Sequence, residues 1–178
     1  MTFRVGILTV SDRCSRGEEQ DRSGPLIADW VREHWSATVA EQAVVPDEQR
    51  LIVQALSAWS GEGGVDLILT TGGTGFAPRD VTPEATRTVI EREAPGLPEA
   101  MRAAGLAKTP HAMLSRAVAG IRGQTLIVNL PGSPKGVLDG LGMLENALPH
   151  GIEILKGVPE SYGRHNAGQR HEHHREQE

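Results

Sequence analysis

Short apolar runs alternate with helix-like stripes over the first half of the chain. Residues 3–10 form a β-rich apolar run, and residues 25–35 then carry an apolar stripe at helical spacing. Residues 38–45 repeat the strand pattern, and a second stripe begins at Asp47 and ends at the GEGG segment. The two stripes consist of Leu26, Ile27, Trp30 and Val31, and of Leu51, Ile52, Ala55, Leu56 and Trp59.

The second half continues the alternation with one irregular region. Residues 65–71 predict a third strand, followed by a glycine loop and a helix with Thr82 as its cap and Pro83 as its first residue. Prolines and glycines break residues 94–116, which predicts short helices and turns wrapping the edge of the sheet. Residues 124–130 predict a fourth strand, and residues 117–121 could add a short one. The last stripe, which Pro149 interrupts, comprises Val137, Leu138, Leu141, Leu144 and Leu148.

This alternation of strands and helices predicts an α/β fold with a mostly parallel central sheet covered on both faces. The length of 178 residues suits one domain, which we expect over residues 1–160. Residues 161–178 are rich in charge and histidine without apolar periodicity, so we expect a disordered tail. Its histidines, at 165, 171, 173 and 174, suggest at most an adventitious metal site.

Composition narrows the possible partners. A net charge of −5 gives no broad basic field for nucleic acid or anionic lipid, so a small-molecule partner is expected. Cys14 is the single cysteine, which excludes an internal disulfide and fits a reducing, cytoplasmic setting. The first residues read as a strand and not as a secretion signal. No run of eighteen apolar residues occurs, so no membrane span is expected.

Chemistry should gather at the carboxyl ends of the parallel strands, where open α/β sheets bind ligands. Four loops converge there: SDRCSRG, PDE, TTGGTGFAPRD and NLPGSPKG. The glycines of TTGGTG would let backbone N–H groups approach a phosphate, although the same segment also suits a tight strand-to-helix turn. Neither a P-loop nor a GxGxxG fingerprint is present.

Two carboxylates stand out beside this loop. Asp47 could cap the following helix or hold a metal, whereas Asp80 precedes the Thr82 cap and is therefore freer for function. Together with substrate phosphates they would suit Mg²⁺ and nucleoside triphosphate chemistry. Asp12 could join them or act as a turn residue.

The other polar residues in these loops have two possible roles each. Arg13, Arg79 and Lys135 could neutralise phosphates or be solvated surface bases. Ser115 and Ser133 could be ligand hydroxyls or turn caps. Spacing alone does not separate these readings.

Taken together, five segments resemble the MogA/MoaB family of molybdenum cofactor biosynthesis over about residues 3–155. They are VSDRCSRGEEQDRSGP, VVPDE, LTTGGTGFAPRDVTPEAT, EREAPGL and MLSRAVAGIRGQTLIVNLPGSPK. The match is nearest to MogA and to the G domains of the plant and animal proteins such as gephyrin. The resemblance implies a three-layer α/β/α fold and, usually, a homotrimer.

The resemblance also implies an activity: AMP transfer from ATP to the terminal phosphate of molybdopterin, with Mg²⁺ as cofactor and release of pyrophosphate. Asp47 and Asp80 match the catalytic, metal-holding aspartates, and the presence of Asp80 favours an active enzyme over a non-enzymatic, MoaB-type binding or scaffold protein. A molybdenum-insertion protein would receive the product. The expected substrate-binding residues are Ser11, Asp12, Thr70, Thr71, Gly72, Gly73, Thr74, Gly75, Ser115, Pro131, Gly132 and Ser133.

Overall fold

The computed structural model of the chain describes residues 2–158, and the predicted tail at 161–178 lies outside these residues. Six strands form one sheet in the order β2-β1-β3-β6-β5-β4. Their bounds are β1 (Phe3–Val10), β2 (Ala37–Val45), β3 (Leu67–Thr71), β4 (Arg92–Glu93), β5 (Ala119–Arg122) and β6 (Thr125–Leu130). Strands β2, β1, β3 and β6 are parallel, while β5 runs antiparallel to both of its neighbours. The predicted α/β fold with a mostly parallel sheet is confirmed.

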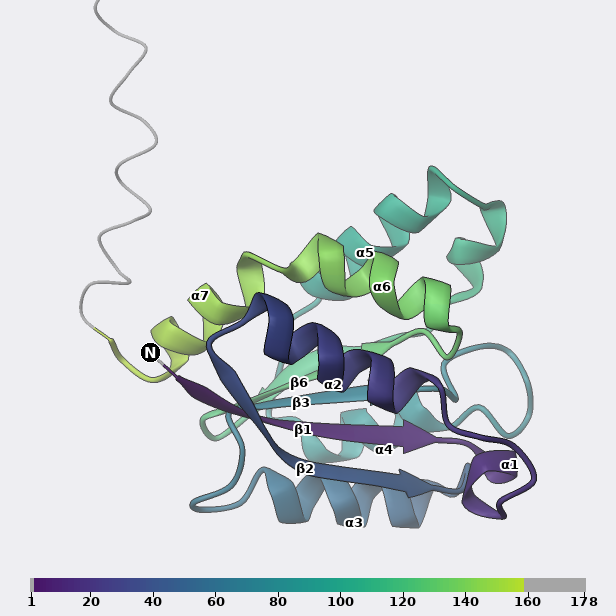
Figure 1. Cartoon of the computed structure of the whole chain (residues 1–178), viewed down its shortest axis with the longest axis horizontal. Coiled ribbons are helices and arrows are strands. Elements are labelled where there is room, and N and C mark those ends of the chain that lie inside the picture. The colour runs from purple at the N-terminus through teal and green to yellow at the C-terminus, as the bar shows by residue number, and fades with distance from the viewer. Residues whose placement is uncertain (1, 159–178) are drawn as a thin grey trace, which may run out of the picture.

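Helices cover both faces of this sheet and make the three layers visible in Figure 1. Four helices, α2, α5, α6 and α7, lie on one face, and α3 and α4 lie on the other. The bounds are α1 (Asp12–Ser15), α2 (Ser23–His34), α3 (Gln49–Trp59), α4 (Thr82–Val89), α5 (Gly96–Leu106), the 3₁₀ helix η1 (Pro110–Leu114), α6 (Pro134–Leu144) and α7 (Ala147–Leu155). Among residues 2–158 no helix is long and apolar enough to cross a bilayer.

The strands β1, β3 and β6 are nearly continuous apolar runs because both of their faces are buried. Successive side chains of a strand point to opposite faces. Accordingly Ile7 and Leu69 pack under α2 and α6, whereas Leu8 and Ile68 pack against α3 and α4. One apolar cluster therefore packs on each face of the sheet. Together they fix the position of its carboxyl edge, the end where the parallel strands finish.

The region of residues 94–116 differs from its prediction. Helix α5 runs unbroken over eleven residues, because Pro98 falls in its first turn, where the N–H has no partner within the helix. The helix packs beside α6 on the face of the sheet, and the sheet edge is formed by β4 and β5 instead.

The final helical stripe is split earlier than predicted. Helix α6 ends at Leu144 and α7 begins at Ala147, so Pro149 lies in the first turn of α7 and does not cause the interruption. Leu138, assigned to the buried stripe, is 42% exposed. The prediction for Leu138 was wrong, since its neighbour Val137 takes the buried position.

The predicted Thr82 cap is wrong, and of the two readings of Asp47 the structure does not support the cap. Helix α4 has Val81 at its N-cap position, and the Thr82 hydroxyl donates instead to the Gly72 carbonyl at 2.9 Å. Helix α3 has Glu48 at the N-cap position without a side-chain bond, so the Asp47 carboxylate is not needed by the helix. Both side chains bond to loops from distant parts of the chain, which local capping preferences do not register.

Candidate functional site

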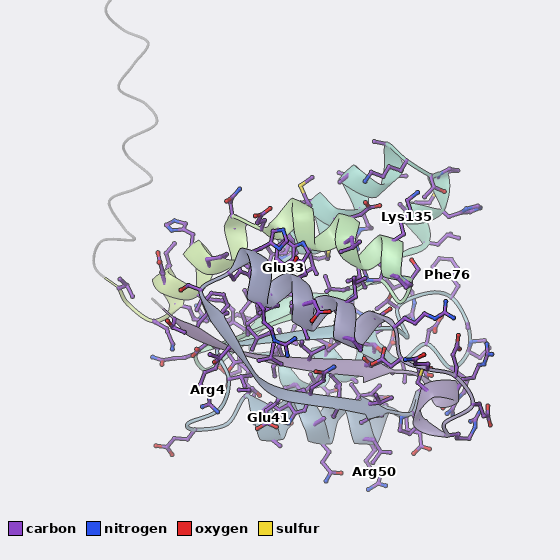
Figure 2. The ribbon with its side chains drawn as sticks, in the orientation of Figure 1. Arg4, Glu33, Glu41, Arg50, Phe76 and Lys135 are labelled. Atoms are coloured by element: carbon purple, nitrogen blue, oxygen red, sulfur yellow. The ribbon has the colours of Figure 1, made fainter. Side chains whose placement is uncertain are left out.

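The predicted loops do converge at the carboxyl edge of the sheet. Hydrogen bonds join them: Ser11 N donates to Val45 O at 2.9 Å, and the Thr71 hydroxyl donates to Pro131 O at 2.7 Å. The loops after β1, β2, β3 and β6 are thus tied to one another as well as to their strands. Figure 2 shows Phe76 and Lys135 at this end of the molecule, with Arg4 at the other.

The centre of the site is the glycine turn, residues 72–75. Gly72 and Gly73 have φ angles of 97° and 64°, a region open mainly to glycine. A Cβ on Gly72 would lie 2.2 Å from Val10 O, so the turn sits directly against the end of β1. On Gly73 a Cβ would lie 3.0 Å from Asp47 Oδ1. The turn is therefore compact and is flanked by a carboxylate.

Asp47 is held by a reciprocal pair of bonds to Asp12. Its Oδ2 accepts the Asp12 N–H at 2.8 Å, and its own N–H donates to Asp12 Oδ1 at 3.1 Å. Burial raises the pKa of the Asp47 carboxyl above its usual value, and the negative charges of Asp12 and Asp80 raise it further. A cation at this position would offset both effects.

Asp80 approaches the same turn from the other side. Its Oδ2 lies 2.9 Å from the position of a Cβ on Gly75 and accepts the Ala77 N–H at 2.9 Å. That is the single hydrogen bond of its carboxylate among residues 2–158. The two aspartates predicted to act together are thus brought to one turn.

Asp12 has a different role from these two. Arg79 holds its carboxylate through a two-bond fork, with Nε–Oδ2 at 3.0 Å and Nη2–Oδ1 at 2.8 Å. The hydrogen bond from Arg79 lowers the pKa of Asp12. The Asp12 charge is therefore balanced within the protein, and Arg79 is engaged with it instead of standing free for a phosphate.

Asp47 and Asp80 fit a magnesium ion that also binds substrate. Mg²⁺ takes oxygen ligands and is usually held by one or two carboxylates together with phosphate oxygens. Within the described part of the chain no group of three or more His, Cys, Asp or Glu side chains could hold a metal.

Two cavities border the glycine turn. The first, of about 380 Å³, lies between α5, η1 and α6 and is lined by Thr74, Gly75, Ser115, Pro131 and Ser133 of the predicted set. The second, of about 330 Å³, lies between α2 and the loop after β1 and is lined by Ser11, Thr71, Gly72 and Gly132. Nine of the twelve predicted binding residues thus divide between two spaces, and Asp12, Thr70 and Gly73 line neither.

The serines combine the two roles left open by the sequence. Ser133 Oγ accepts the Gly136 N–H at 3.2 Å as the cap of α6, and Ser11 Oγ accepts the Cys14 N–H at 3.2 Å as the cap of α1. Ser115 Oγ accepts the Ala117 N–H at 3.4 Å. All three also line a cavity, so capping leaves them at the cleft.

Thr70 does not reach the cleft. It is fully buried, and its hydroxyl accepts a 3.0 Å bond from Asn129 Nδ2. Asn129 also donates to the Thr86 hydroxyl at 2.9 Å and accepts the Val118 N–H at 3.1 Å. The Thr70 side chain is thus held in a buried polar network below the turn.

Sequence reasoning missed several residues of the site. Arg116 binds the loop that carries Asp80, and the first cavity has basic lining residues that no motif had indicated. Arg116 follows Ser115 directly and precedes β5, whereas the four loops expected to converge all follow strands. The additional basic lining residues are Arg102, Lys108 and His111.

Comparison with known proteins adds a family to this geometry. Residues 6–150 match the family described as "Probable molybdopterin binding domain". The chain is 45% identical over 156 residues to molybdopterin adenylyltransferase of Escherichia coli K12, covering 85% of this chain and 80% of that protein. It is also 45% identical to gephyrin of Dictyostelium discoideum, covering 88% of this chain but 23% of that protein. The chain thus spans about a quarter of the length of gephyrin.

Solved structures agree with the assigned fold. The molybdopterin biosynthesis enzyme MoaB of Thermus thermophilus superposes with a TM-score of 0.83 at 54% identity, covering 88% of this chain and 98% of that one.

Proposed function

The chain belongs to the family of molybdopterin-binding domains matched above, and from this premise we propose that it is a molybdopterin adenylyltransferase. It would transfer AMP from ATP to the terminal phosphate of molybdopterin. A phosphate oxygen of molybdopterin attacks the α-phosphorus of ATP, a new P–O bond forms, and the bond between the α-phosphorus and the bridging oxygen breaks. Pyrophosphate leaves with that oxygen.

What supports this proposal most is that Asp47 and Asp80 lie against the same glycine turn, next to Gly73 and Gly75 respectively. The raised pKa of Asp47 is consistent with a carboxylate whose ionised form a bound cation would stabilise. When bound, Mg²⁺ supplies positive charge that offsets charge building up on the phosphates. Asp47 and Asp80 are the residues that would hold it.

The other tasks fall to the backbone and to the cavity walls. The substrate supplies its own ionised oxygen, so no protein nucleophile is required, and catalysis consists of alignment and charge stabilisation. Backbone N–H groups of the turn at residues 72–75 would bind phosphate. Lys135 lines the first cavity at the start of α6, where its ammonium group can meet an anionic substrate.

The test is AMP transfer by purified protein with molybdopterin, ATP and magnesium, followed by detection of adenylylated molybdopterin and pyrophosphate. We expect Asp80→Asn, which keeps shape and removes charge, to abolish pyrophosphate release while molybdopterin still binds. Asp29→Asn on the outer surface of α2, where Asp29 pairs with Arg32, is the matched control and should keep full activity. Unchanged turnover of Asp80→Asn would refute the role of Asp80.

A second candidate is a non-enzymatic molybdopterin-binding protein. The 54% identical structure named MoaB is itself described as a biosynthesis enzyme, so this candidate is the weaker of the two. Binding of molybdopterin by a wild-type protein that neither binds Mg-ATP nor releases pyrophosphate would decide for it.

The proposal extends to assembly and setting. We expect a single domain over residues 1–160, working in the cytoplasm as a homotrimer that passes its product to a molybdenum-insertion protein. Exposed apolar side chains, among them Phe76 at 68% and Met113 at 60%, are of the kind that a subunit contact covers. Analytical ultracentrifugation would measure the mass, and a monomer at micromolar concentration would contradict the trimer.

A further inference from the structure

Arg116 binds the loop that carries Asp80 at more points than any motif suggests. It precedes β5 and is about one-third exposed. Its backbone N–H donates to Thr74 O at 2.9 Å, and its Nε donates to Gly75 O at 2.7 Å. Its Nη2 donates to Asp80 O at 2.5 Å. One residue therefore holds both ends of the segment 75–80.

We propose that Arg116 is a positioning residue for AMP transfer: by bonding the carbonyls of Gly75 and Asp80 it closes the segment 75–80 into a fixed loop and sets where the Asp80 carboxylate stands relative to Asp47. This inference rests on the proposed function. It assigns Arg116 no contact with substrate or metal. Its effect passes through Asp80.

The other bonds of the loop are internal, apart from the fork between Arg79 and Asp12. Inside it, Asp80 N donates to Ala77 O at 2.9 Å and Ala77 N donates to Asp80 Oδ2 at 2.9 Å. Phe76, Pro78 and Arg79 are exposed. On its C-terminal side, Thr82 N donates to Gly73 O at 3.1 Å. Arg116 supplies the side-chain bonds to the backbone carbonyls at the two ends of the loop.

Glu84 fixes the direction of the guanidinium. Arg116 Nη1 donates to Glu84 Oε1 at 2.5 Å, while Glu84 Oε2 is buried without a hydrogen-bond partner among residues 2–158. Burial raises the pKa of Glu84, but the hydrogen bond from Arg116 lowers it and keeps it below its usual value. Glu84 therefore stays charged and holds Nη1, which leaves Nε and Nη2 aimed at the two carbonyls.

Lysine could not take this role. The guanidinium is planar and directs separate donors to three partners, whereas an ammonium group is a single point at the end of a flexible stem. Gly75 O, Asp80 O and Glu84 Oε1 each bind a different nitrogen of Arg116. Arg116→Lys should therefore keep the positive charge and lose the positioning.

Arg4 provides a matched control at the opposite edge of the sheet. Its Nη1 donates to Gly63 O at 2.8 Å and to Gly64 O at 3.1 Å, so it also anchors a glycine-rich loop through two carbonyls. Arg4→Gln should lower stability without affecting the cleft. A purely structural Arg116 would behave in the same way.

The first measurement needs no activity: hydrogen exchange of the amides of residues 75–80. Arg116→Gln and Arg116→Lys should speed exchange at Ala77 and Asp80 at least tenfold, while Arg4→Gln leaves both unchanged. The second is steady-state kinetics, in which the Arg116 variants should lose at least tenfold in kcat, keep KM for molybdopterin within about twofold, and require more magnesium.

Two results would overturn the inference: unchanged exchange at residues 75–80, or a loss of kcat in Arg116→Gln no larger than in Arg4→Gln. If the wild type transfers no AMP, the proposed function fails separately. In that case the positioning role is tested by hydrogen exchange and by Mn²⁺ binding in the presence of ATP, which electron paramagnetic resonance measures. Weaker Mn²⁺ binding by the Arg116 variants supports the positioning role, and equal binding overturns it.

Discussion

Replacing Gly72 with alanine tests whether the glycine turn depends on its close approach to β1. The backbone at Gly72 has a φ of 97°, and a Cβ there would lie 2.2 Å from Val10 O. Gly63 provides the comparison: its φ is 72°, and a Cβ would meet nothing within 4 Å. Both alanine variants carry the strain of a left-handed backbone, so their difference isolates the steric contact.

The magnitudes can be separated in this way. A left-handed residue with a Cβ costs about 1–2 kcal/mol, and both variants carry this term. Overpacking against a rigid neighbour costs about 1–3 kcal/mol. Displacing the Gly72 carbonyl would also weaken its bond from Thr82, worth about 1 kcal/mol. Gly72→Ala should therefore lose about 2–4 kcal/mol more than Gly63→Ala.

Urea unfolding followed by circular dichroism gives this difference directly. For a chain of this size 1 kcal/mol corresponds to about 2–4 °C, so the melting temperatures should differ by about 4–16 °C. Equal losses in the two variants would refute the reasoning, since they would mean that β1 and the turn separate without cost. In that case the turn could not hold Asp47 and Asp80 in a fixed relation.

Two further predictions concern the polar groups around the turn. Asn129→Leu should lower the free energy of unfolding in urea by about 3–5 kcal/mol, because it breaks three buried hydrogen bonds and leaves the Val118 N–H without a partner. The control Thr88→Ala on the surface should change this free energy by no more than about 0.5 kcal/mol. Similar losses in the two variants would contradict the prediction. Asp47→Asn should raise the melting temperature at neutral pH without magnesium. The pKa of the Asp47 carboxyl is raised in the folded protein, so the wild type loses stability as the pH rises through that folded-state pKa. The gain of the variant should vanish in acid, and a variant less stable than the wild type at pH 7 would contradict this reasoning.

Much of the fold could be read from periodicity because the central strands are buried on both faces. The runs at β1, β3 and β6 are nearly all apolar, and parallel pairing then brings their carboxyl ends to one edge. That reasoning placed Asp47 and the glycine turn together without knowledge of any contact. It rests on the alternation of strands with helices, because a helical crossover returns the chain to a parallel strand.

Long-range choices of polar side chains could not be read in this way. Thr82 has the right position for a cap but bonds to Gly72, and Thr70 belongs to a buried network with Asn129. Such partners lie ten or more residues apart, and the residue types alone allow both outcomes. Arg116 was not predicted because β5 is antiparallel to β6. The residues that precede β5, and not those that follow it, therefore lie at the carboxyl edge of the sheet.

The ion pair between Lys156 Nζ and Asp66 Oδ1 has a consequence for how this unit combines with others. It ties the residue after α7 to the residue before β3, at the amino end of the sheet where β1 also starts. Both connections to neighbouring polypeptide thus leave from the side opposite the cleft. A fusion partner attached at either end would therefore begin on the side away from the candidate site.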